Sequence, residues 1–470
     1  MSFDTIIRGG TVVTAADTFA SDVGIRGGKI VALGHDLGVA ATIIDATDRL
    51  VMPGGIDSHV HFAQPSGEGI VMADGFATGT RSAAFGGNTT VLPFCLQEKG
   101  QTLREALKGY HALAEGECYV DVAFHLIVTD PTEQVLGQEL PALVEDGYTS
   151  LKVFMTYEGL ALSDRELLET MSVARETGAM LMVHAENFDA IRFLTDRLER
   201  AGNTAPRFHG ASRPIPVERE ATHRAISLSE LIDVPIMIVH VSNREAMEEI
   251  RRAQQRGLRV LGETCPQYLM LTEKDLDQLN MEGAKYVCSP PPRDVASQKA
   301  CWEGLQQKVF SVFSSDHCPF RYDDPQGKLA PKGRTSFRWV PNGIPGVATR
   351  LPILFSEGVG KGRIDLNSFV AFSATNHAKI YGLYPRKGTI AVGSDADIAL
   401  WDPKRKVTIR HELIHDGADY TPYEGLEVTG WPVLTMVRGK VIVDDGKLVG
   451  TKEHGTYLPR ARPPASSNLS

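Results

Sequence analysis

The chain has 470 residues, of which 42% are hydrophobic, and its net charge at pH 7 is −9. This length is ample for a large core and exceeds one ordinary domain, so we expect one large domain and a smaller one. An acidic chain without basic runs is not expected to bind nucleic acid or an anionic membrane surface.

The N-terminal sequence and the cysteines indicate the cellular compartment in which the protein is expected. The first residues, MSFDTIIRGG, lack the basic stretch and apolar core of a secretory signal. No apolar run of about 18 residues is available to cross a membrane. The six cysteines form no CxxC pair and are sparse for this length, which is typical of reduced thiols. We therefore expect a cytoplasmic protein that is not bound to a membrane.

Both ends of the chain predict short β-strands. The run at 23–26 meets Gly27-Gly28 and returns at 29–33, a pattern typical of a hairpin. Similar apolar runs occur at 397–401 and 433–443. Because neither end has enough strands for an independent sheet, we expect one β-sandwich built from residues 1–53 and 387–458. The tail at 459–470 is expected to be flexible.

Between these ends, strand-like runs alternate with helix-like stretches such as Asp164–Thr177 and Arg244–Gln255. Eight strands are expected, at Val51–Asp57, Thr89–Phe94, Val120–Ile127, Ser150–Phe154, Met180–His184, Ile236–His240, Arg259–Gly262 and Val312–Ser315. Eight such repeats predict an α/β fold, a (β/α)8 TIM barrel over residues 54–386. The alternative, a doubly wound sheet, would usually carry a Gly-rich phosphate turn after its first strand. A polar motif stands there instead.

That polar motif is Gly55-Ile56-Asp57-Ser58-His59-Val60-His61. Residues i and i+2 of a strand share one face, about 6.6 Å apart, so two imidazoles can converge on one metal ion. Two ordinary hydrogen-bonded or surface histidines would give the same pattern. The motif by itself therefore leaves both interpretations open.

Its position in the expected barrel favours the metal. Barrel enzymes carry their chemistry where the strands end, and His59 and His61 close the first expected strand. His184, His240 and Asp316 close the fifth, sixth and eighth. Four strands ending in His or Asp at one face are hard to explain by packing.

Lys152 is unusual in the otherwise apolar fourth strand. Lysine is rarely buried unless it is paired, and an ammonium has no lone pair for a metal. A carbamate formed from its amine and CO2 would be an anion with two oxygens, able to bridge two ions. The sequence does not show this modification directly.

These residues are similar to those of the amidohydrolase superfamily. More narrowly, the chain resembles the dihydropyrimidinase and D-hydantoinase family over nearly its full length. The supporting strings are Lys152-Val153-Phe154-Met155-Thr156-Tyr157, Val183-His184-Ala185-Glu186-Asn187, Glu263-Thr264-Cys265-Pro266-Gln267-Tyr268, Ser315-Asp316-His317-Cys318-Pro319-Phe320 and Tyr384-Pro385-Arg386-Lys387-Gly388-Thr389-Ile390.

The resemblance implies a hydrolase with two divalent metal ions per subunit, expected to be zinc, and a homotetramer. His59, His61 and Asp316 would bind the more buried ion, His184 and His240 the second, and carboxylated Lys152 would bridge both. Tyr157 would donate a hydrogen bond to the oxyanion. Main-chain groups of Ser289 and Asn342 would hold the cyclic amide.

The implied reaction opens a cyclic ureide, either a 5,6-dihydropyrimidine or a 5-substituted hydantoin, to an N-carbamoyl amino acid. A metal-bridging hydroxide would be the nucleophile and Asp316 the general base. An allantoinase or a cyclic-imide hydrolase could use the same site. Ala63 replaces the arginine typical of dihydroorotases, and a non-catalytic relative would have lost metal ligands that this chain keeps.

One loop departs from the family pattern, and three histidines have no place in the expected site. The loop Phe62–Ile70 departs from the family's more apolar string, so the sequence does not decide the exact substrate. His111, His209 and His223 have no partner pattern, and we expect them at the surface.

Overall fold

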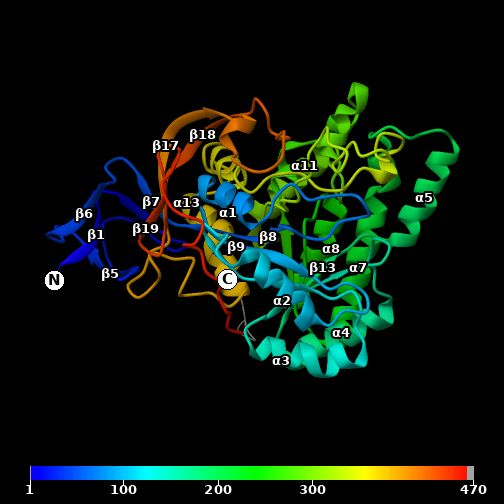
Figure 1. The fold of residues 1–470 in the computed structure, drawn as a ribbon, viewed down its shortest axis with the longest axis horizontal. Coiled ribbons are helices and arrows are strands. Elements are labelled where there is room, and N and C mark those ends of the chain that lie inside the picture. The colour runs from blue at the N-terminus through cyan, green and yellow to red at the C-terminus, as the bar shows by residue number, and fades with distance from the viewer. Residues whose placement is uncertain (1, 463–470) are drawn as a thin grey trace.

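The computed structural model describes residues 2–462, which form a barrel and, beside it, two smaller sheets near the N-terminus (Figure 1). Within these residues, none of the helices combines the length and the apolar character that a membrane crossing needs.

Eight strand positions form a parallel, nearly closed barrel. Its strands are β8 (Gly55–Val60), β9 (Asn88–Leu96), β10 (Asp121–Val122) with β11 (His125–Ile127), β12 (Ser150–Phe154), β13 (Met180–His184), β14 (Ile236–Ile238), β15 (Val260–Thr264) and β16 (Val312–Phe313). A parallel bridge between Val60 and His317 joins the first strand to the segment after the last. The TIM-barrel prediction is confirmed, and the doubly wound alternative is wrong.

Helices follow the barrel strands and cover their outer face (Figure 1). The expected helices at 164–177 and 244–255 are observed as α4 (Asp164–Thr177) and α8 (Arg244–Gln255). Both start at side-chain caps, Ser163 and Asn243, which satisfy backbone N–H groups of the first turn. The other helices are α1 (Phe76–Phe85), α2 (Leu103–Ala114), α3 (Leu140–Glu145), α5 (Phe188–Arg200), α6 (Phe208–Ser212), α7 (Ile215–Ile232), α9 (Pro266–Met270), α10 (Glu273–Leu276), α11 (Val295–Gln306), α12 (Arg350–Ile353), α13 (Leu366–Val370) and α14 (Asn376–Ile380).

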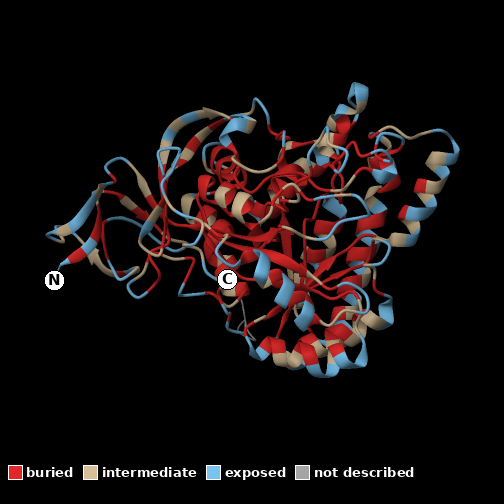
Figure 2. Ribbon diagram, in the orientation of Figure 1, coloured by how far each residue is buried: buried red, intermediate tan, exposed pale blue. Residues whose placement is uncertain are grey.

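The strands alternate between two hydrophobic cores. In β13, Met180 and Met182 belong to the cluster inside the barrel, whereas Leu181 and Val183 belong to the cluster between barrel and helices. Successive side chains of a strand point to opposite faces, and both faces are covered here. The barrel strands are accordingly buried except for the partly buried Leu96 and Leu261, and the exposed residues lie on outer helix faces, loops and the smaller sheets (Figure 2).

The two smaller sheets combine both ends of the chain. One contains β1 (Phe3–Arg8), β4 (Asp22–Arg26), β5 (Lys29–Gly34) and β6 (Ala40–Asp45) in the order β5-β4-β1-β6. The other has the order β20-β19-β18-β17-β7-β2-β3, with β2 (Thr11–Val13), β3 (Thr18–Ala20), β7 (Leu50–Pro53), β17 (Ile398–Thr408), β18 (Glu427–Val437), β19 (Lys440–Asp444) and β20 (Lys447–Leu448). A shared core that includes Ile25, Val51 and Ile398 packs them together as the expected sandwich. The expected hairpin is β4–β5, whose turn places Gly27 and Gly28 at φ 58° and 74°.

Several strands differ from the expected ranges. The first is divided, since β7 joins the sandwich and β8 starts the barrel. The apolar run continues across this break, so periodicity could not reveal it. A side chain at Gly54, between the two, would lie 2.1 Å from Thr89. The third strand is divided into β10 and β11, and β14 and β16 end earlier than expected.

The domain boundaries stay a prediction, but the start of the expected flexible tail can be described. Arg460 is buried, donates to Ser150 Oγ at 2.7 Å and also binds the carbonyl of Phe124. This differs from the flexible tail expected from residue 459. The rest of that tail, from residue 463, lies outside the described residues.

Candidate metal centre

Six predicted ligands meet where the barrel strands end. They are His59, His61, Lys152, His184, His240 and Asp316, and all are buried. His59 lies in β8, Lys152 in β12 and His184 at the end of β13, while His61, His240 and Asp316 lie just beyond their strands. His240 and Asp316 have φ values of 41° and 51°. Such left-handed conformations cost roughly 1–3 kcal/mol each and cluster at functional sites.

The nitrogen and oxygen atoms of these side chains face one another. His59 Nε2 and His61 Nε2 lie 3.2 Å and 3.5 Å from Asp316 Oδ1. His184 Nδ1 lies 3.0 Å from His240 Nε2. Ligand-type atoms of His59, His240 and Asp316 all lie within 4.8 Å of one another, which joins the two pairs into one cluster.

This geometry fits a divalent metal. With a metal–nitrogen distance of about 2.1 Å, the ligand atoms of a tetrahedral ion lie about 3.4 Å apart. The contacts of 3.0, 3.2 and 3.5 Å are close to that separation. Imidazole nitrogens with a carboxylate oxygen form a donor set that zinc and similar ions prefer. The residues therefore fit the metals that the resemblance implies.

Three neighbouring acceptors orient the histidine rings. His59 Nδ1 donates to Glu263 Oε1 at 2.6 Å, and His61 Nδ1 donates to Gln64 Oε1 at 2.7 Å. His184 Nε2 donates to Glu186 Oε2 at 2.7 Å. Each bond leaves the other ring nitrogen with its lone pair toward the cluster, the usual arrangement around protein-bound metals.

The roles of these acceptors were missed from the sequence. Gln64 and Glu186 lie within three residues of the histidines that they orient, which is the one signal that could have found them. Glu263 lies in β15, 204 residues from His59, and its place in a family string gave no sign of this contact.

The electrostatics of the cluster follow from burial. Burial lowers the pKa values of His59, His184 and His240, which keeps these rings neutral. Burial also lowers the pKa of Lys152 and raises that of Glu263. The opposite charges of the two groups partly offset both shifts, since each favours the charged form of the other.

The amine of Lys152 lies over two aromatic rings. Its Nζ lies 5.2 Å from the ring centre of Phe94 and 5.3 Å from that of Phe154. It makes no hydrogen bond or ion pair within residues 2–462. Lys152 is therefore a buried amine that lies close to the histidine cluster.

A second group of possible ligands has a different explanation. Asp74, His317 and Asp416 also have ligand-type atoms within 4.8 Å of one another. However, His317 Nε2 donates to Asp74 at 2.7 Å, and its Nδ1 accepts from the backbone N–H of Gly346 at 3.0 Å. Neither nitrogen keeps a lone pair for an ion, so His317 is a hydrogen-bonding residue.

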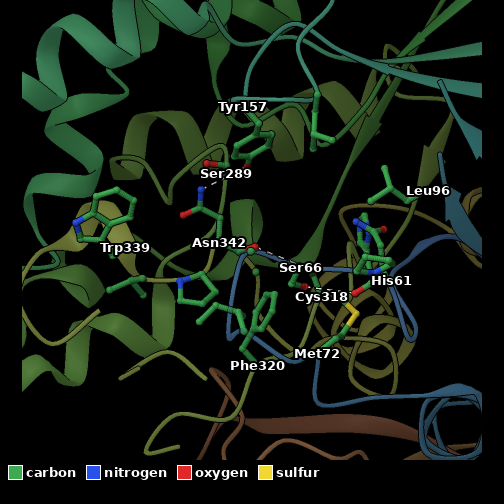
Figure 3. A pocket seen from close by; sticks show the side chains of 18 of the residues that line it. His61, Ser66, Met72, Leu96, Tyr157, Ser289, Cys318, Phe320, Trp339 and Asn342 are labelled. Atoms are coloured by element: carbon green, nitrogen blue, oxygen red, sulfur yellow. Dashed lines mark hydrogen bonds between the residues drawn. The ribbon is translucent and has the colours of Figure 1, made fainter. Parts of the chain in front are cut away.

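These six candidate ligands, called the metal cluster below, form the floor of a pocket of about 1060 Å³. The other predicted site residues line the same pocket, with Tyr157, Ser289 and Asn342 together on one side and His61 across from them (Figure 3). The Tyr157 ring lies 5.3 Å from that of His184, and its hydroxyl accepts a long hydrogen bond of 3.5 Å from Asn342 Nδ2. The structure thus brings all predicted site residues into one cavity.

The rim of this pocket consists of loops. The loop that departs from the family pattern contributes Gln64, Ser66, Glu68 and Ile70. Apolar side chains complete the wall, among them Leu96, Leu160, Phe320 and Trp339. The loop Phe62–Ile70, which the family pattern does not predict, therefore lines the pocket in which a substrate would bind.

The surface prediction for the remaining histidines is correct for one of the three. His223 is exposed and His111 is half-buried, but His209 is buried, and its Nε2 donates to the carbonyl of Cys288 at 2.8 Å. Its partner is a main-chain atom 79 residues away, which no sequence pattern indicates.

Comparison with known proteins agrees with this geometry. The family model of the amidohydrolase family matches residues 50–442. The D-hydantoinase of Ralstonia pickettii is 46% identical over 460 residues, covering 98% of this chain and 99% of that protein. A solved D-hydantoinase structure superposes with a TM-score of 0.95 at 47% identity, covering 97% of this chain and 99% of the other. A dihydropyrimidinase from Brevibacillus agri has the same TM-score and coverage at 45% identity.

Proposed function

The chain belongs to the amidohydrolase family, within the group of D-hydantoinases and dihydropyrimidinases, and we propose that it opens the amide bond of a cyclic ureide by metal-assisted hydrolysis. The family and the relatives make it a hydrolase of cyclic amides. The observation that supports the metal-assisted step is the buried cluster of four histidines, Lys152 and Asp316 on the pocket floor.

We further propose that the cluster holds two zinc ions. His59, His61 and Asp316 would hold one, His184 and His240 the other, with carboxylated Lys152 between them. When bound, the ions would supply a hydroxide nucleophile from water at neutral pH and would polarise the substrate carbonyl. The buried position of Lys152 and the contacts among the ligand atoms support this assignment.

The chain's own residues would carry out the remaining steps. Main-chain groups of Ser289 and Asn342 would hold the ring, and the Tyr157 hydroxyl would donate a hydrogen bond to the carbonyl oxygen as it becomes negative. Asp316 Oδ1 lies toward His59 and His61, which leaves Oδ2 to accept the proton of the attacking water and pass it to the leaving nitrogen. A C–O bond forms, the ring C–N bond breaks, and an N-carbamoyl amino acid results.

A homotetramer and a cytoplasmic location complete the proposal. The tetramer rests on the family resemblance alone, and sedimentation of the purified protein tests it. The location is in keeping with six cysteines that are all free thiols.

A substrate panel tests the proposed reaction. The metal-loaded protein is assayed with dihydrouracil, hydantoin, 5-phenylhydantoin, allantoin, dihydroorotate and succinimide. We expect hydrolysis of a dihydropyrimidine or a 5-substituted hydantoin, with the N-carbamoyl product identified by mass. Turnover of allantoin or succinimide alone would favour the alternative substrates, and no turnover of any compound would contradict the proposed function.

A further inference from the structure

Lys328 is a fully buried lysine outside the metal cluster. Its side-chain ammonium donates to the main-chain carbonyl of Val287 at 2.6 Å and to that of Pro341 at 2.9 Å. It forms no ion pair with any carboxylate of residues 2–462. Lysine is almost never fully buried without such a partner, so its position needs an explanation.

The two carbonyls belong to the two segments that line one side of the pocket. Val287 precedes Ser289 by two residues, and Pro341 directly precedes Asn342. The N–H of Gly343 also donates to the carbonyl of Val287 at 3.0 Å. Lys328 therefore joins these two segments without itself lining the pocket.

Lys328 also anchors a third part of the pocket wall. It lies two residues before Ala330, which lines the pocket together with Pro331 and Lys332. Its side chain thus connects the loop at 328–332 to the other two segments, which are themselves joined by the backbone bond between Gly343 and Val287.

The burial of this lysine costs free energy that an apolar residue would not. Burial lowers its pKa to about 7, because the charged form loses its hydration. The neutral amine still has two N–H groups and can donate to both carbonyls. The connection between the segments is therefore available whether or not the amine is protonated.

We propose that Lys328 is a positioning residue that sets the distance between Ser289 and Asn342, and thereby the fit of the cyclic amide ring. This inference rests on the proposed function, in which the main-chain groups of those two residues hold the ring. Lys328 touches neither the substrate nor the metal cluster in this arrangement.

Kinetics of Lys328→Met test the proposal, because methionine fills similar space without donors. The metal content per subunit is expected to stay at the wild-type value. KM for the substrate found with the wild type is expected to rise by about tenfold or more, the loss that one or two broken hydrogen bonds can produce, with a smaller effect on kcat. Lys328→Arg, which keeps the donors, is expected to recover part of the loss. Lys404→Met, at an exposed lysine of β17, is the matched control.

Hydrogen exchange gives a readout that does not depend on the identity of the substrate. In Lys328→Met, the amides of Val287 and Gly343, which donate to the carbonyls of Ala284 and Val287, are expected to exchange about tenfold faster than in the wild type, with the barrel strands unchanged. Unchanged KM and unchanged exchange at these amides, with only a lower Tm, would overturn the proposal and leave Lys328 a purely structural residue.

A second variant covers the case in which Lys328→Met does not fold. Lys328→Gln keeps two N–H donors on a shorter chain and is expected to show the same changes to a smaller extent. Wild-type KM and exchange in that variant would equally overturn the proposal. Failure of the wild type to hydrolyse any cyclic ureide would instead contradict the proposed function, and exchange would still test Lys328.

Discussion

The floor and the rim of the pocket are built in different ways. The floor consists of buried side chains within or just beyond the strands of a nearly closed barrel, and each oriented histidine has its own acceptor. The rim consists of loops, with exposed residues such as Glu68 and Glu158 beside apolar ones such as Leu160. Rigid strand ends suit a reaction that needs fixed geometry, whereas loops can change without disturbing the barrel.

This difference separates the chemistry of the site from its selectivity. Changes on the floor are expected to alter metal binding and turnover for every substrate. Changes on the rim are expected to alter the choice among substrates and leave the metals in place.

Lys152→Ala is expected to have the largest effect. Without the proposed bridging anion, four neutral imidazoles and one carboxylate would have to hold two dications, so metal and activity should be lost together. Metal analysis of the purified variant and its turnover are the measurements. A short carboxylic acid added to the variant should restore part of both, because it can replace the carbamate. Two metals per subunit with normal turnover would exclude the bridging role.

Asp316→Asn is expected to have the second-largest effect. Its turnover should fall by orders of magnitude while the fold is kept. The amide has nearly the same shape but cannot accept and return the proton as a carboxylate does. Circular dichroism checks the fold and initial rates check the chemistry. Rates near those of the wild type would remove Asp316 as the general base.

Glu263→Gln and Gln64→Met compare a floor residue with a rim residue on the same His-x-His pair. Glu263 orients His59 from a strand end, and Gln64 orients His61 from the loop. Loss of such an acceptor typically weakens metal affinity by about 10- to 100-fold. We expect the loss of metal affinity in Glu263→Gln to fall in that range and the loss in Gln64→Met to be smaller. Competition with a chelator measures both. A larger effect for Gln64→Met would contradict the division between floor and rim.

Trp339→Ala is expected to have the smallest effect on the chemistry. Trp339 is half-exposed at the pocket mouth, where Arg338 and Lys332 stack against its ring. Its removal should change KM for an aryl-substituted hydantoin by about tenfold or less, equal to about 1.4 kcal/mol of apolar contact. KM for unsubstituted hydantoin and the metal content should stay unchanged. Equal losses for both substrates would show that the rim does not act as a selectivity element.

Much of the floor could be predicted because its signals are local. Alternating apolar strands, capped helices and His or Asp residues near strand ends depend on neighbours in sequence, and α4 and α8 match their expected ranges. The contacts between distant segments could not be predicted. Glu263 meets His59, His209 meets Cys288 and Lys328 meets Val287 only after the chain has folded, across 41 to 204 residues.

The division of the first expected strand has a related cause. An apolar run looks the same whether it lies in one sheet or passes from the sandwich to the barrel. The break at Gly54 depends on the close approach of Thr89, which is a tertiary contact. The loop after His61 is harder still, because neither periodicity nor the family pattern constrains it.

The central claim is that the buried cluster holds two metal ions that are needed to open a cyclic ureide. The most direct test measures metal per subunit and hydrolysis of a 5-substituted hydantoin on the same preparation, before chelation, after chelation and after zinc is restored. The account predicts two ions per subunit with ring opening to the N-carbamoyl amino acid, loss of both on chelation, and recovery of both with zinc. Undiminished ring opening by the metal-free protein would contradict it.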